Sequence, residues 1–61
     1  MPQYLTEHEV AELINRKVQT LRNDRFKGQG LPYIKMGRMV RYNYEEVVAF
    51  MDSHKIQPEA S

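Results

Sequence analysis

The sequence predicts a small α+β fold with the element order helix–helix–strand–strand–helix (α-α-β-β-α), mostly helical with one two-stranded antiparallel hairpin. Two capping-box patterns, Thr6 with Glu9 and Asn43 with Glu46, predict that one helix starts near residue 7 and another near residue 44. Between these helices, Gly37 separates two short stretches that are rich in β-branched and aromatic residues. Such a pattern is typical of a hairpin.

The first helix is predicted from Glu7 to Ile14 or Asn15. Val10, Leu13 and Ile14 follow the i, i+3, i+4 spacing that gives a helix one apolar face. Asn15 tolerates the left-handed conformation in which many helices end. A tight turn therefore follows the helix.

A second helix is predicted over residues 18–25 or 18–26, about three residues after the first. With Leu21 facing the core, the helical repeat points the side-chain amides of Gln19 and Asn23 away from it. Two short helices joined by so tight a turn predict a helix-turn-helix, whose second helix is free to enter a DNA groove.

The hairpin is predicted from strands at residues 31–35 and 39–43, with a turn at residues 36–38. Its edge and tip are basic because of Lys35, Arg38 and Arg41. A basic hairpin that follows a helix-turn-helix is a wing, so the sequence predicts a winged helix-turn-helix.

The third helix is predicted to begin after Asn43 and to end near His54. Its apolar stripe comprises Tyr44, Val47, Val48 and Met51, with Phe50 at the border. The 61 residues allow one small core. We therefore expect a single domain at residues 1–56 and a flexible tail at residues 57–61.

Charge is segregated along the chain. Eight of the nine Lys and Arg residues lie between Arg16 and Arg41, with Asp24 as the only acid, so this segment carries +7. The segments before and after it each carry −3. A cationic segment inside a nearly neutral chain favours a phosphate-rich partner, because each Lys or Arg that reaches a phosphate releases counterions.

Several function classes are disfavoured. The chain has no cysteine, and His8 and His54 are isolated from other candidate ligands. We see no catalytic triad and no phosphate-cradling glycine loop, so we expect no enzyme, no cofactor and no metal. The apolar runs are too short to span a membrane. We expect a cytoplasmic, nucleoid-associated protein in which most tyrosines pack in the core rather than stack on bases.

Several segments together resemble a known family: Leu5-Thr6, residues 10–14, 20–22, 31–38 and 40–42, and Glu46-Val47. The chain is similar to the small excisionase-like winged helix-turn-helix proteins. These include phage and integrative-element excisionases (recombination directionality factors) and AlpA-like regulators, with a fold related to the MerR DNA-binding domain. The resemblance runs from about Leu5 to Met51, and its most specific part is the hairpin motif from Pro32 to Tyr42.

The resemblance implies DNA binding, with the second helix in the major groove and the wing on the minor groove or its phosphates. By position, the implied contacts are Lys17, Gln19, Thr20, Arg22 and Asn23 in the helix, and Lys35, Arg38 and Arg41 in the wing. The chain departs from the family at Arg16-Lys17, where a small apolar residue and a capping Ser are usual. It also has Asp24 where many relatives have an aromatic; Phe26, Tyr33 and Tyr42 are candidates to compensate.

The expected function is sequence-specific binding of double-stranded DNA, as an excisionase or a small transcriptional regulator of a phage or integrative element. The expected partners are DNA, an integrase or recombinase, and further copies of the chain bound cooperatively. The alternative is a protein-interaction module for a recombinase or other acidic partner, with little DNA binding. Structural pairing also remains open for two arginines: Arg22 with Asp24 or a first-helix acid, and Arg41 with Glu45 or Glu46.

Overall fold

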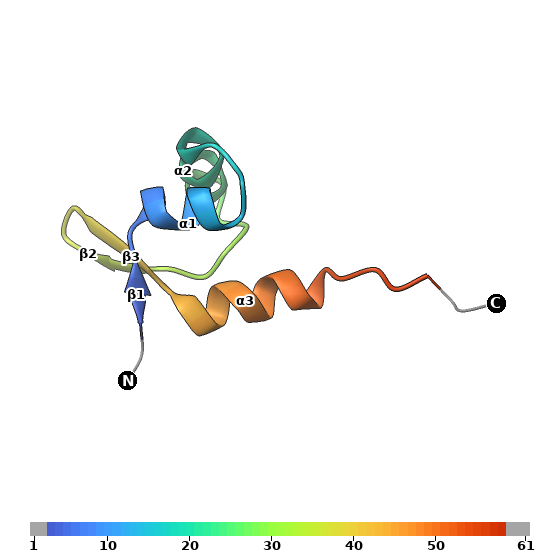
Figure 1. Ribbon diagram of the computed structural model, residues 1–61. Coiled ribbons are helices and arrows are strands. Elements are labelled where there is room, and N and C mark those ends of the chain that lie inside the picture. Colours follow the sequence, from blue (N-terminus) through green and yellow to red (C-terminus); the bar gives the residue numbers. More distant parts are fainter. Residues whose placement is uncertain (1–2, 59–61) are drawn as a thin grey trace.

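The structure is a computed structural model that describes residues 3–58 (Figure 1). It is a small α+β fold with three helices and a three-stranded antiparallel sheet. The order is β-α-α-β-β-α: β1 (Tyr4–Leu5), α1 (Glu7–Leu13), α2 (Val18–Phe26), β2 (Ile34–Met36), β3 (Met39–Asn43) and α3 (Tyr44–Ser53). Of the tail predicted at residues 57–61, Gln57 and Pro58 are exposed and lack regular structure. Residues 59–61 lie outside the described residues.

The prediction of a two-stranded sheet was wrong, because β1 adds a third strand. Tyr4 pairs with Asn43 and Leu5 with Tyr42, so β3 lies in the middle of the sheet between β1 and β2. A strand of two residues shows no alternation in the sequence, and only its partner defines it.

The hairpin forms around a tighter turn than predicted. Met36 is the last residue of β2 and pairs with Met39, which leaves only Gly37 and Arg38 in the loop. Gly37 has a φ of 60°, as its place in the turn requires. The predicted start of the first strand was wrong, since Leu31 lies in the core outside the strand and β2 begins at Ile34.

The predicted capping box at the start of α1 is confirmed. The Thr6 hydroxyl accepts a hydrogen bond from the Glu9 N–H at 3.1 Å, and the Glu9 carboxylate accepts one from the Thr6 N–H at 2.8 Å. The helix ends at Leu13, and Asn15 has the predicted left-handed conformation, with a φ of 57°. The Arg16 N–H donates back to the Ala11 carbonyl at 2.8 Å, which closes a Schellman motif.

The bounds of α2 match the longer of the two predicted ranges. The helix begins after Lys17, whose side chain makes no capping hydrogen bond. It ends in a second Schellman motif: the N–H of Gly28 donates to the Arg25 carbonyl at 3.0 Å and that of Gln29 to the Asp24 carbonyl at 2.9 Å. These bonds fix the direction in which the chain leaves α2 for the hairpin.

The third helix starts directly after β3. Asn43 is both the last strand residue and the helix cap, and its side-chain oxygen accepts from the Glu46 N–H at 3.1 Å. The predicted apolar stripe is partly wrong: Val47 is buried and Phe50 packs against the core, whereas Tyr44 and Met51 are exposed. In Figure 1, α3 lies beside the rest of the fold, and its C-terminal end extends beyond the other two helices.

The core is small and lies between the sheet and the helices. Tyr42, Val10 and Val47 are its most buried large side chains, and the whole cluster comprises Leu5, Val10, Ala11, Leu21, Leu31, Tyr42 and Val47. The expectation that most tyrosines pack in the core was wrong, because only Tyr42 does so; the exposed ones are Tyr4, Tyr33 and Tyr44. None of the helices in residues 3–58 combines the length and the apolar character needed to cross a bilayer.

Candidate nucleic-acid interface

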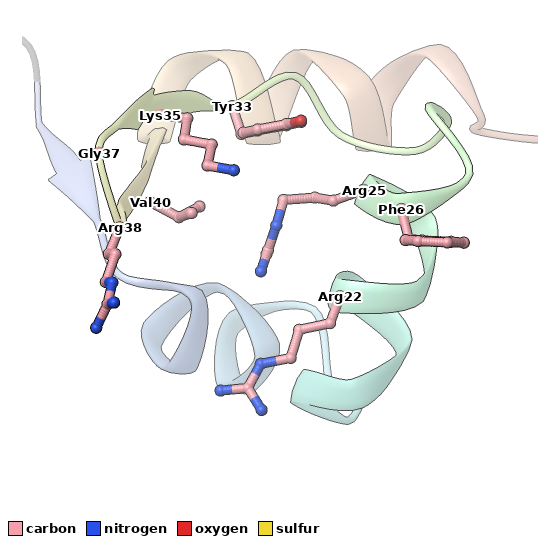
Figure 2. Close-up of a pocket in the computed structure, with 8 residues that line it drawn as sticks. All are labelled: Arg22, Arg25, Phe26, Tyr33, Lys35, Gly37, Arg38 and Val40. Carbon is pink, nitrogen blue, oxygen red and sulfur yellow. The ribbon is translucent and has the colours of Figure 1, made fainter.

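An open depression lies between α2 and the β2–β3 hairpin (Figure 2), and we call it the basic depression. Four cations and no acid are among the residues that line it: Arg22, Arg25, Phe26, Tyr33, Lys35, Gly37, Arg38 and Val40. Residues from the predicted recognition helix and from the predicted wing therefore meet on one surface. Three of the eight predicted contact residues take part: Arg22, Lys35 and Arg38.

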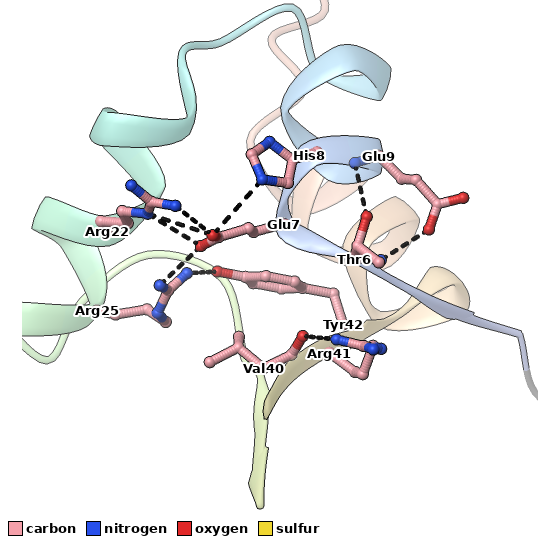
Figure 3. Close-up of polar contacts among 9 residues, drawn as sticks. All are labelled: Thr6, Glu7, His8, Glu9, Arg22, Arg25, Val40, Arg41 and Tyr42. Atoms are coloured by element: carbon pink, nitrogen blue, oxygen red, sulfur yellow. Dashed lines mark hydrogen bonds and ion pairs between the residues drawn. The ribbon is translucent and has the colours of Figure 1, made fainter. Parts of the chain in front are cut away.

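The strand register explains which hairpin residues reach the basic depression. Lys35 is opposite Val40, and both side chains lie on the face of the sheet that meets α2. Arg41 is opposite Ile34, so its side chain leaves the sheet on the opposite face. Its guanidinium donates to the Val40 carbonyl at 2.8 Å (Figure 3) instead of pointing into the basic depression.

Arg25 joins α2 to the sheet from inside the basic depression. Its Nη1 donates to the Tyr42 hydroxyl at 2.7 Å and its Nη2 to Glu7 Oε1 at 2.8 Å. The guanidinium also lies 5.8 Å from the centre of the Tyr33 ring, within cation–π range. Because only 17% of its side chain is exposed, Arg25 serves mainly as a structural brace.

Arg22 pairs with the same acid on α1, one of the structural partners that the sequence left open for it. Its Nη2 donates to Glu7 Oε2 at 2.7 Å and its Nε to the same oxygen at 3.2 Å. The Arg22 side chain remains 48% exposed, so it can still meet a ligand. Figure 3 shows the Glu7 carboxylate between the two guanidiniums.

Arg22 and Arg25 together lower the pKa of Glu7, the acid that they share. Hydrogen bonding from Arg22 lowers the pKa of Glu7 from 4.5 to about 2; partial burial opposes this shift, and the hydrogen bond and charge of Arg25 add to it. Glu7 is therefore an anion at any physiological pH. The ionised Glu7 carboxylate therefore lies beside Arg22, at the edge of the basic depression.

The other predicted contacts of α2 fall into two groups. Lys17, Gln19 and Asn23 are exposed, and Gln19 Nε2 donates to Asn23 Oδ1 at 3.0 Å, which shows that the two amides share one face. Thr20 is half-buried and lines a separate groove that also includes Gly30. It does not line the basic depression.

Two possibilities that the sequence left open for α2 are not realised. Phe26 does not pack on the hairpin: it is 93% exposed, and Figure 2 shows its ring pointing away from the basic depression. Asp24 pairs with no arginine in residues 3–58, because the ion pairs there all involve Glu7. Asp24 instead lies against the loop, 3.4 Å from the side-chain nitrogen of Gln29.

Sequence reasoning left Arg25 and Tyr33 out of the site. Arg25 follows Arg22 by three residues, a spacing that places both on neighbouring parts of one helix face. That signal was available, but nothing in the sequence indicated that Arg25 would bond Tyr42.

In residues 3–58 no three His, Asp or Glu side chains gather closely enough to hold a metal ion.

Comparison of the chain with protein-family models, with curated proteins and with solved structures finds no match.

Proposed function

We propose that this chain binds double-stranded DNA through the basic depression and the exposed face of α2. In this proposal α2 enters the major groove and the β2–β3 hairpin lies on the neighbouring phosphates or minor groove, as in a winged helix-turn-helix. The observation that carries it is the meeting of Arg22, Lys35 and Arg38, from two separate elements, on one surface without a lining acid.

The distribution of the acids supports the same proposal. The exposed acids Glu45, Glu46 and Asp52 are on α3, and Glu9 and Glu12 are on α1; none of them lines the basic depression. The basic depression is thus lined by positive charge, which attracts phosphates and raises the rate of encounter.

The resemblance to excisionase-like proteins supports a more specific role, as an excisionase or a small transcriptional regulator. A domain this small covers few base pairs, so we expect several copies to bind neighbouring sites cooperatively. An integrase or recombinase is the protein partner that the excisionase role implies.

The test is a gel-shift titration of the full chain on duplex DNA at several salt concentrations. If five or six phosphates are neutralised, the logarithm of the binding constant should fall with the logarithm of salt concentration with a slope of about −4 to −6. A flat salt dependence would contradict the proposal.

A second candidate function, binding of a recombinase or other acidic protein, is favoured by the outer face of the sheet. The strand register places Tyr4, Ile34, Met36 and Met39 on that face with Arg41, and the four apolar side chains are exposed. Capture of a purified recombinase that survives nuclease treatment, together with no shift of duplex DNA at low salt, would favour this function over DNA binding.

A further inference from the structure

A continuous chain of side chains connects the core to the exposed Arg22 (Figure 3). Tyr42 is only 1% exposed and holds Arg25 through its hydroxyl. Arg25 holds Oε1 of Glu7, and Glu7 offers Oε2 to Arg22. The surface arginine is thereby connected through two charged partners to a fully buried side chain.

The way in which Glu7 holds Arg22 decides what the guanidinium can still do. The carboxylate takes one edge of the group, formed by Nε and Nη2. Within residues 3–58 no partner is recorded for Nη1, and Nη2 keeps a second N–H. The end of the guanidinium, with two parallel donors, is therefore free and held in one orientation.

This free end matches one feature of DNA. Guanine presents two acceptors, O6 and N7, side by side in the major groove, and a forked pair of arginine N–H groups is their best-fitting partner. A forked arginine can also bind a phosphate, but a phosphate contact fixes the register of a protein without reading bases. A braced arginine on the proposed recognition helix is thus suited to reading a base.

We propose that Glu7 is a positioning residue that presents the free end of Arg22 to a guanine in the major groove. This inference rests on the proposed DNA binding and adds a specificity to it. Glu7 also carries a negative charge close to where the phosphates would lie, so it weakens general electrostatic attraction. Its removal should therefore have opposite effects on the two kinds of binding.

The experiment first selects a preferred site from a random duplex pool with the wild-type chain. Dissociation constants are then measured for that site and for a scrambled duplex, at one salt concentration, with wild type, Glu7→Gln and Glu12→Gln. Glu12 is the matched control, because it is an exposed acid on α1 whose side chain makes no hydrogen bond or ion pair within residues 3–58. Thermal melting confirms that each variant is folded at the assay temperature.

With Glu7→Gln we expect tighter binding to the scrambled duplex and a preference for the selected site that falls about ten-fold. Glu12→Gln should leave that preference unchanged. Replacing each guanine of the site in turn by 7-deazaguanine, which lacks N7, should reveal one position at which wild type loses about five- to ten-fold and Glu7→Gln loses much less. A purely structural role for Glu7 would not produce this difference.

Arg22→Lys provides a second measurement if Glu7→Gln does not fold. Lysine keeps the charge but lacks the planar fork that Glu7 braces, so the preference for the selected site should fall and the response to 7-deazaguanine should weaken. An unchanged preference in either variant, which for Glu7→Gln includes equal gains on both duplexes, would overturn the inference while DNA binding stands. If wild type binds no duplex at low salt, the proposed function fails and this inference fails with it.

Discussion

Arg25 donates a hydrogen bond of 2.7 Å to the hydroxyl of Tyr42, and this bond joins α2 to the central strand of the sheet. One of the basic residues in the cationic middle segment is therefore part of the internal structure. The charge that a ligand meets in the basic depression comes mainly from Arg22, Lys35 and Arg38.

We expect Arg25→Ala to lower the free energy of unfolding by about 2 kcal/mol, because it removes two charge-assisted hydrogen bonds and leaves the Tyr42 hydroxyl without its partner. Arg38→Ala is the matched control, since Arg38 is exposed; it should change stability by less than about 0.5 kcal/mol. Urea denaturation followed by circular dichroism measures both. Equal effects of the two substitutions would show that Arg25 is not a brace.

Acid should destabilise the protein through Glu7. Its pKa is lowered to about 2 in the folded state by the hydrogen bonds and charges of Arg22 and Arg25, against 4.5 for the free group. The unfolded chain therefore binds the proton more readily than the folded one. The stability that Glu7 contributes is complete above about pH 5 and disappears as the pH falls towards 2.

The size of this loss is about 2 kcal/mol, after allowance for solvent screening at the half-exposed Arg22. Urea denaturation at a series of pH values between 7 and about 2 measures it. Glu7→Gln should remove most of the pH dependence, and Glu9 accounts for a remaining part, since the Thr6 hydrogen bonds lower its pKa as well. A wild-type profile as flat as that of Glu7→Gln would contradict the ion-pair geometry.

Lys35 and Arg38 in the hairpin should contribute to DNA affinity without contributing to the stability of the fold. Lys35→Ala and Arg38→Ala should each weaken binding to all duplexes and make the salt slope less steep by about 1, as expected for the loss of one phosphate contact. Lys55→Ala is the control, because Lys55 is exposed beyond α3 and does not line the basic depression. If Lys55→Ala lowers DNA affinity as much as Arg38→Ala, the overall charge of the chain, and not contact with the basic depression, attracts the DNA.

Gly30 occupies a position that no larger residue fits. Its φ is +86°, and a Cβ built there would lie 2.9 Å from Cβ of Asp24. Gly30→Ala should therefore destabilise the protein by about 2 kcal/mol, from backbone strain and from the clash. Gly28→Ala, with a similar φ of +70° but open space around it, should cost about 1 kcal/mol. If urea denaturation shows equal losses of stability for the two variants, the contact with Asp24 does not contribute to the cost of Gly30→Ala.

The helices were the most predictable part of the fold because their signals are local. A capping box, a left-handed Asn15 and the 3.6-residue repeat each depend on a few neighbouring residues, and they located α1 and α2 to within one or two residues. The sheet was less predictable. β1 exists only because Tyr4 and Leu5 reach residues almost forty positions later, and no local pattern carries that information.

The candidate site was likewise predictable only in part. The sequence predicted that Arg22, Lys35 and Arg38 belong together, and the structure brings them to one surface. For Arg22 it left open a pair with Asp24 or with an acid of the first helix, a choice that depends on how α1 lies against α2. The inward role of Arg25 depends on a bond to a residue seventeen positions away, so side-chain chemistry alone could not reveal it.

The two-residue strand β1 makes the ends of this domain unequal for protein engineering. Leu5 supplies both a core side chain and one edge of the sheet, and the backbone carbonyl of Gln3 accepts a hydrogen bond from the Tyr44 N–H at 2.8 Å. Trimming these early positions would therefore remove tertiary structure, and a bulky fusion partner attached there would crowd it. Labels and affinity tags are better placed after α3, because residues 55–58 are exposed and lie outside regular structure.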